Sequence, residues 1–173
     1  MNGKRFSAVL GALLLFLVLG ACNQADEQTD GTNDGDESGS SGENGEVTYV
    51  SHIEGIVEQS CISCHGGDSP SLEEFKEDPD PYIAESKGPR FDNYEELIVL
   101  VNGDDAGAIM RRLDDGENTE DGEPGNMYVN LGSTEEERQE NLAIFKEWVG
   151  SWSLKRSDEL TDEERAEIPA VRE

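Results

Sequence analysis

The chain has few basic residues. Its 173 residues include 13 lysines and arginines against 40 aspartates and glutamates, which gives a formal net charge of −27 at pH 7. Nucleic acids and anionic lipid headgroups carry charge of the same sign and would be repelled, so neither is expected as a partner. Because the acids are spread over the whole chain, we interpret them as a solvated surface suited to high salt rather than as an acidic docking face for a basic partner.

Long apolar runs, strand patterns and aromatic residues are also scarce. The longest apolar stretch, 6–19, is too short for a membrane span. No segment shows a convincing strand pattern, and aromatic residues make up only 6% of the chain. We therefore predict an all-α domain with a thin apolar core, whose centre is filled by something other than side chains.

The first residues have the pattern of an export signal. Lys4 and Arg5 precede the apolar stretch, which ends in "LGAC" at residues 19–22. A short basic region followed by an apolar region and small residues is typical of a cleaved signal peptide. The segment resembles a bacterial lipoprotein signal, which implies removal of residues 1–21 and lipidation of the Cys22 thiol.

A polar linker follows the signal. Residues 22–46 are rich in Gly, Ser, Asn, Asp and Glu and contain no basic side chain. Such a segment cannot bury enough apolar surface to offset the entropy cost of ordering, so we predict a disordered acidic tether. About 24 flexible residues would span roughly 25–30 Å.

Apolar periodicity predicts about four helices in the domain, 47–155. The first begins near Val47 and runs into a pair of cysteines. Three more segments have helical periodicity or capping residues: 93–103, 106–116 and 133–152. In the last of these, Ser133 and Glu136 have the spacing of a capping box.

The remaining segments have the composition of loops. Residues 66–92 contain four prolines, which predicts a long loop with one turn of helix, and residues 117–132 form a second loop. In the tail, 156–173, Thr161 and Glu164 indicate the start of a short polar helix.

Two cysteines and a histidine form the most specific motif in the chain, "CISCH" at Cys61, Cys64 and His65. A structural zinc site needs four ligands, and the only other histidine, His52, precedes the motif on the same predicted helix. A thioredoxin-like dithiol needs a βαβ context, for which the strands are missing. Both interpretations are therefore weak.

The third interpretation is attachment of a c-type haem, for which C-x-x-C-H is the signature. Two thiols at positions i and i+3 can each add to one vinyl group of a porphyrin. His65, the next residue, can then offer a ring nitrogen to the iron. A single covalent haem c would also supply the missing centre of the domain.

Residues 47–155 resemble a monohaem class I c-type cytochrome in bacterial lipoprotein form. The resemblance rests on a helix leading into "CISCHGG", middle helices, a methionine loop and a C-terminal aromatic helix. It implies that the first and last helices cross. Tyr49, Ile53 and Gly55 on the first helix should meet some of four residues on the last: Phe145, Trp148, Val149 and Trp152. The long 66–92 loop and the tail depart from the family pattern.

The candidates for the sixth iron ligand are Met127, Met110 and His52. Met127 lies in "EPGNMYVNLG", where the family carries its methionine loop, and we assign it this role. Met110, the alternative, lies between Ile109 and Leu113 on a patterned helix, where methionine more often packs in a core. His52 is too close to the attachment site to reach the opposite face of the iron. An open sixth position is the remaining possibility.

The arginines Arg90, Arg111 and Arg112 are rare bases in an acidic chain. One of them could pair with a haem propionate, but we expect ordinary ion pairs with neighbouring acids.

These features predict a non-catalytic electron carrier, tethered by Cys22 on the outer face of the cytoplasmic membrane or its periplasmic side. The resemblance implies redox partners such as a quinol-oxidising complex and a terminal oxidase or reductase. One alternative is a relay subunit of an oxidoreductase complex, with the tail as its docking element; the tail could instead be a strap across the domain. The other alternative is a five-coordinate haem sensor or peroxidase.

Overall fold

The computed structural model describes residues 45–173. The predicted signal peptide, the lipidated Cys22 and nearly all of the 22–46 tether lie outside the described residues. The described part of the chain consists of helices and loops without a strand, which confirms the all-α prediction. None of its helices combines the length and hydropathy needed to cross a bilayer.

The domain begins with a helix that leads into the cysteine motif, as predicted. A π-helical turn, η1 (Tyr49–Ile53), continues into α1 (Glu54–Ser60), and α2 (Ile62–His65) follows after one residue. The Thr48 hydroxyl caps η1 by accepting a hydrogen bond from the Ser51 amide, 3.3 Å away.

Two short helices occupy the segment predicted as a long loop. The first, α3 (Leu72–Glu77), starts at a capping box of Ser71 and Glu74 and corresponds to the predicted turn of helix. The second, α4 (Asp80–Ala84), was not predicted. Its prolines lie at the N-terminal end, where a missing N–H costs nothing. Every residue of both helices is at least partly exposed.

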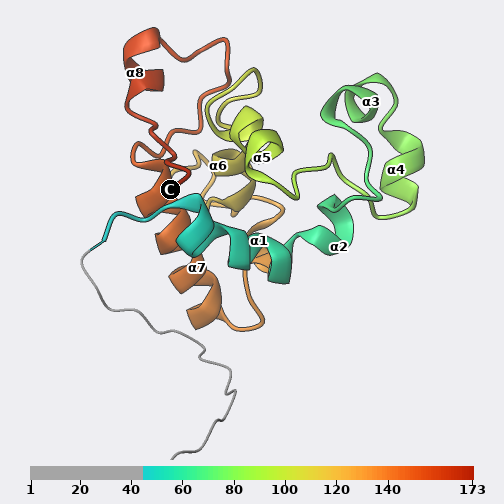
Figure 1. Ribbon diagram of the computed structural model, residues 1–173, viewed down its shortest axis with the longest axis horizontal. Coiled ribbons are helices and arrows are strands. Elements are labelled where there is room, and N and C mark those ends of the chain that lie inside the picture. The colour runs from blue at the N-terminus through green and yellow to red at the C-terminus, as the bar shows by residue number, and fades with distance from the viewer. Residues whose placement is uncertain (1–44) are drawn as a thin grey trace, which may run out of the picture. The chain divides into compact units, whose positions relative to one another are not determined.

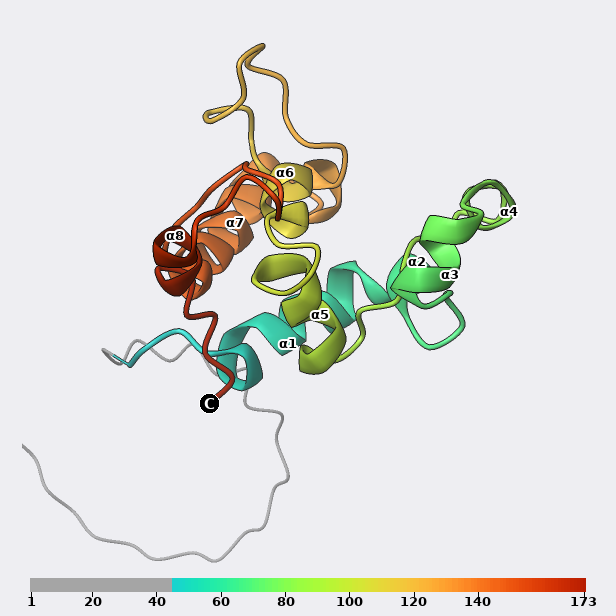
Figure 2. The same cartoon turned by 90° about the horizontal axis from the view of Figure 1, so that it is seen from above.

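We call residues 71–87 the α3–α4 lobe. Figures 1 and 2 show that it projects beyond α2, on the side of the domain away from the C-terminus.

Three further helices match the predicted segments: α5 (Tyr94–Val101), α6 (Ala108–Leu113) and α7 (Glu135–Val149). The 3₁₀ turn η2 (Tyr128–Asn130) lies in the segment that was predicted to be a loop. Asn93 caps α5 as expected. The predicted cap of the last helix was wrong by one residue, because Thr134 and not Ser133 accepts the hydrogen bond from the Glu137 amide, at 3.1 Å.

The first and last helices meet in the core, as the resemblance implied. The rings of Tyr49 and Trp148 lie 6.2 Å apart, and Ile53 and Val149 are completely buried. Gly55 was wrongly expected here, since a Cβ at this position would meet no described atom within 4 Å. Further core side chains come from α5, α6, η2 and the segment after it: Leu97, Val101, Met110, Tyr128 and Leu131.

The tail turns back onto this crossing. After α8 (Asp162–Ala166), which starts at the predicted Thr161 capping box, Ile168 and Ala170 are buried in the core. The Val171 carbonyl accepts hydrogen bonds from the Tyr49 amide at 2.9 Å and from Trp148 Nε1 at 2.8 Å. The C-terminus accordingly lies beside the first segment of the domain (Figures 1 and 2). We call residues 168–172 the C-terminal strap.

Candidate cofactor site

A cavity of about 960 Å³ lies between α2, the α3–α4 lobe, α5, α6 and the segment before η2. This is at the upper end of the range for cofactor pockets. Much of its wall is apolar: Leu72, Phe75, Phe91, Leu97, Leu100, Ile109, Leu113, Leu131 and Phe145. The cavity accounts for the thin core inferred from the composition, because the helices surround a space that their side chains do not fill.

Cys61 and Cys64 both line this cavity as free thiols. The amides of Cys64 and His65 donate to the Cys61 carbonyl at 3.1 and 3.0 Å, so the motif forms one helical turn. Burial, with a smaller contribution from Cys64, raises the pKa of the Cys61 thiol to about 11. The thiol is therefore protonated at neutral pH and retains the hydrogen that addition to a vinyl group requires.

His65 also faces the cavity, and one of its ring nitrogens is already engaged. Nδ1 lies 2.7 Å from the Pro89 carbonyl oxygen, so Nδ1 carries the proton and donates it. Burial lowers the pKa of His65, and the bond to Pro89 partly offsets this effect. The neutral ring thus keeps Nε2 free as an acceptor or metal ligand.

The segment after the lobe fixes the plane of this ring. Phe91 stacks on it with the ring centroids 4.3 Å apart, and the Phe91 amide donates to the His65 carbonyl at 3.0 Å. Gly88 packs on the ring so closely that a Cβ would lie only 2.7 Å from Nδ1. Sequence reasoning missed Gly88, Pro89 and Phe91. Only the Gly-Pro pair in the long loop could have signalled a tight approach of the backbone.

The two methionine candidates have different surroundings. Met127 is partly buried and lines the cavity, and its Sδ accepts a hydrogen bond from Asn130 Nδ2 at 3.5 Å. Met110 is completely buried outside the cavity lining, and its Sδ lies 3.3 Å from the Ser153 amide. His52 also lies outside the lining, with Nδ1 accepting from the Thr48 amide at 3.3 Å.

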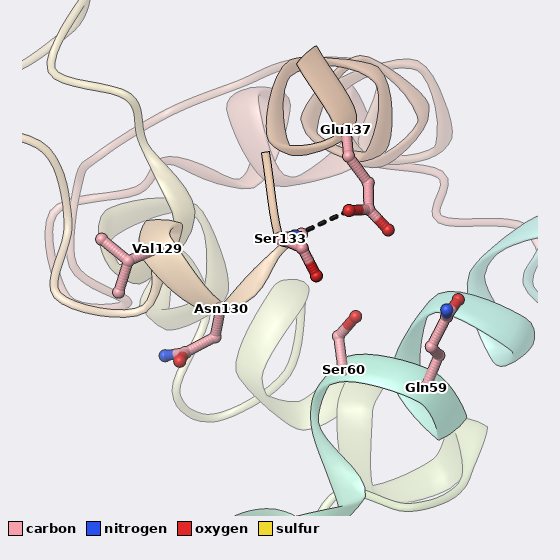
Figure 3. Close-up of a pocket in the computed structure, with 7 residues that line it drawn as sticks. Gln59, Ser60, Val129, Asn130, Ser133 and Glu137 are labelled. Carbon is pink, nitrogen blue, oxygen red and sulfur yellow. Dashed lines mark hydrogen bonds between the residues drawn. The ribbon is translucent and has the colours of Figure 1, made fainter. Parts of the chain in front are cut away.

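A smaller pocket of about 360 Å³ adjoins the large cavity (Figure 3). Ser60 and Asn130 line both spaces, and the Ser133 amide donates to Glu137 at 2.6 Å on its rim. Its lining is mostly polar. Across residues 45–173, no group of three or more His, Cys, Asp or Glu side chains is arranged to hold a metal ion.

The comparison with protein families gives a match over residues 48–172 to the family described as PccH cytochrome c. This chain belongs to the PccH cytochrome c family. A solved structure, that of the monohaem cytochrome PccH from Geobacter sulfurreducens, is 48% identical and superposes with a TM-score of 0.70. The alignment covers 73% of this chain and 99% of that one. The comparison with curated proteins found no match.

Membership in this family confirms the predicted monohaem c-type cytochrome with one covalently bound haem c. The cavity fits this group, since it combines two free thiols, an oriented imidazole and apolar walls. The match extends to residue 172, so the tail that departed from the class I pattern is included in it. The assignment of individual attachment and ligand residues stays a prediction.

Proposed function

We propose that this PccH-family cytochrome is an electron-transfer protein whose haem iron is bound by His65 Nε2 and Met127 Sδ. The observation that carries the proposal is that one cavity is lined by both the "CISCH" motif and Met127. Haem c would attach through Cys61 and Cys64 and would supply a one-electron couple at its iron. The protein then has to hold both ligands and exclude water.

Each ligand is held by contacts of its own. His65 is oriented by Pro89 and Phe91. The Met127 amide donates to the Arg112 carbonyl at 2.9 Å, which ties the methionine segment to the end of α6. Apolar side chains from α5 and α6 then exclude water between the ligands. A site with both ligands fixed in advance needs little rearrangement when the charge on the iron changes, which suits an electron carrier.

The alternatives have less support. The relay-subunit hypothesis uses the tail as a docking element, but the strap packs Ile168 and Ala170 within the domain's own core. The five-coordinate sensor or peroxidase requires an open sixth position, and Met127 is available at the cavity wall. We therefore favour the six-coordinate carrier, and we propose no catalytic residue.

We further propose that the carrier is lipid-anchored through Cys22 on the outer face of the cytoplasmic membrane, or on its periplasmic side. The "LGAC" sequence and the polar tether support this location. There the domain would exchange electrons with partners such as a quinol-oxidising complex and a terminal oxidase or reductase.

Two methionine variants of the haem-loaded protein test the ligand assignment. Met127→Ala should abolish the weak near-infrared absorption band of methionine-ligated ferric haem and open the reduced iron to carbon monoxide. Met110→Ala should keep that band but lose roughly 2–5 kcal/mol of unfolding free energy, because it removes a buried core side chain. Ready carbon monoxide binding by the reduced unmodified protein would contradict the proposal.

A further inference from the structure

The basic residues in the described part of the chain divide into three groups. Six form ion pairs with carboxylates: Lys76, Arg90, Arg138, Lys146, Lys155 and Arg172. Arg165 instead donates to the carbonyls of Asn102, Gly103 and Ser157 at 2.9–3.0 Å. The remaining bases within 45–173 have no carboxylate within 4.0 Å of their side-chain nitrogens, and all of them line the large cavity: Lys87, Arg111, Arg112 and Arg156.

This distribution is unusual for so acidic a chain. Acids outnumber bases by 40 to 13, so a base on the surface should find a carboxylate partner by default. Bases without such partners collect around one cavity instead. An anion inside that cavity would neutralise them.

Lys87 differs from the three arginines in its position. Its Nζ donates to the Ser63 carbonyl at 3.3 Å, and Ser63 lies between the two cysteines of the attachment motif. Lys87 is therefore at the edge of the cavity where the vinyl-derived side of a haem bound through Cys61 and Cys64 would lie. The propionates would extend from the opposite edge of the ring, away from Lys87.

The arginines come from other parts of the fold. Arg111 and Arg112 lie on α6, and Arg156 lies in the segment between α7 and α8. Both views show α6 separated from α2 across the domain (Figures 1 and 2). The three arginines therefore lie where the propionates of the haem would be, away from the edge of the cavity where the two thioether bonds would form.

Arg111 is held in place by the backbone. Its Nη1 donates to the Lys155 carbonyl at 2.7 Å and to the Ala106 carbonyl at 3.4 Å, which leaves Nε and Nη2 free for another acceptor. Burial and the positive charge of Arg156 lower the pKa of Arg111, with a smaller contribution from Arg112. Asp105 and Glu159 act in the opposite direction, but Asp105 already pairs with Lys76 at 3.3 Å.

The other two arginines also have side-chain hydrogen-bond donors without an acceptor among the described residues. Arg112 uses Nη1 on the Asn126 side chain at 3.0 Å. The guanidinium of Arg156 makes no hydrogen bond to any described residue, although its backbone amide donates to Glu159 at 2.7 Å. Three guanidinium groups therefore repel one another at one edge of the cavity with most of their donors unused.

We propose that Arg111, Arg112 and Arg156 bind the two haem propionates. Guanidinium and carboxylate groups form short, charge-assisted and often bidentate hydrogen bonds, and the two carboxylates would relieve the repulsion among the arginines. Surface ion pairs were expected for Arg90, Arg111 and Arg112, and only Arg90 forms one, with Glu96 at 2.7 Å. A docking surface for an acidic partner is less favoured, because Arg111 is half-buried and tied to the backbone.

The test compares haem-loaded Arg111→Gln, Arg112→Gln and Arg156→Gln with Arg90→Gln as the matched control. Each variant at the proposed site should shift the reduction equilibrium toward the ferric form by about tenfold, since a nearby positive charge is lost. Each should also shift the propionate bending mode in the resonance Raman spectrum. Arg90→Gln should change neither by a comparable amount, and Arg111→Lys should restore part of the potential if Arg111→Gln perturbs folding.

Two results would overturn the proposal. In one, the three variants match the control in potential, in propionate mode and in their rate of reaction with hexacyanoferrate, an anionic oxidant. In the other, the potential and the propionate mode are unchanged but the variants react more slowly with hexacyanoferrate, which would make the arginines an external docking surface. The test does not depend on Met127, since propionate binding can fail while the methionine-dependent absorption band persists.

Discussion

The C-terminal strap and the α3–α4 lobe are both short segments outside the main helices of the domain, yet different contacts stabilise them. The strap buries Ile168 and Ala170 and makes backbone bonds to η1. The lobe buries no side chain. Its Leu72, Phe75 and Ile83 line the cofactor cavity, and Ile83 is still 59% exposed. Protein contacts stabilise the strap, whereas the lobe borders the space that the haem fills.

This difference assigns the haem a structural role. The cavity of about 960 Å³ is walled largely by apolar side chains, which haem would cover and which water would contact in its absence. Domains are stable by only roughly 5–15 kcal/mol, so covering this apolar wall is a substantial contribution to the stability of the fold. The haem is therefore part of the core of this PccH-family domain as well as its redox centre.

Loss of the haem should have the largest effect. The double variant Cys61→Ser and Cys64→Ser removes both proposed attachment points, so we expect most of the helical circular dichroism and the cooperative unfolding transition to be lost. Cys22→Ser is the matched control, because it should keep both the haem and the folded domain while leaving the protein out of the membrane fraction. Cooperative unfolding of the haem-free variant would contradict the structural role.

Two isoleucine substitutions compare the strap with the lobe directly. Ile168→Ala deletes a side chain that is 1% exposed and should cost roughly 2–5 kcal/mol of unfolding free energy. Ile83→Ala removes the same atoms from the lobe and should change it by less than about 0.5 kcal/mol. Denaturant titration of both haem-loaded variants measures the difference, and equal losses would mean that the lobe is held as firmly as the strap.

Two glycine substitutions compare the cavity wall beside His65 with the helical part of the domain. Gly88→Ala would push a Cβ into the His65 ring, so we expect a weakened iron–histidine bond, seen as a high-spin component in the absorption spectrum. Gly55→Ala has open space within a helix and should stabilise the protein by about 0.5–1 kcal/mol with an unchanged spectrum. An unchanged spectrum in Gly88→Ala would show that the ring can move without loss of ligation.

Local sequence signals predicted much of the fold. Asn93 before α5 and Thr161 with Glu164 before α8 fix helix starts through contacts within one turn, which depend on sequence alone. The start of α7 was misplaced because Ser133 with Glu136 and Thr134 with Glu137 offer two overlapping capping boxes. Only the surrounding structure selects Thr134.

Features that depend on distant contacts were beyond sequence reasoning. Cys61, Cys64 and His65 are recognisable because their chemistry lies within five consecutive residues. The packing of Gly88 on His65 spans a loop and has no local pattern. The same holds for Ile168, whose burial depends on the return of the tail, and for the arginines of α6, whose lack of ion pairs depends on what surrounds them.

A buried carboxylate also stabilises the helical part of the domain. Asp114, at the end of α6, is completely buried and accepts hydrogen bonds from the Gly116 amide at 2.9 Å, from Asn118 Nδ2 at 2.8 Å and from Trp152 Nε1 at 2.8 Å. Burial alone would raise the pKa of Asp114, but these hydrogen bonds, with that of Asn118 foremost, outweigh it and lower the pKa. The carboxylate thus joins the loop after α6 to the segment after α7.

Because the folded-state pKa of Asp114 lies below its unfolded value, its contribution to stability is present above the unfolded pKa and is lost as the pH falls through the folded one. Asp114→Asn should therefore cost roughly 1–3 kcal/mol at neutral pH and flatten the decline of stability below about pH 4. The exposed Asp104→Asn is the matched control and should leave the unfolding free energy at neutral pH unchanged. Denaturant titrations from neutral to acidic pH check both variants. A parallel decline in Asp114→Asn and in the unmodified protein would mean that other carboxylates, rather than this one, set the acid limit of the helical core.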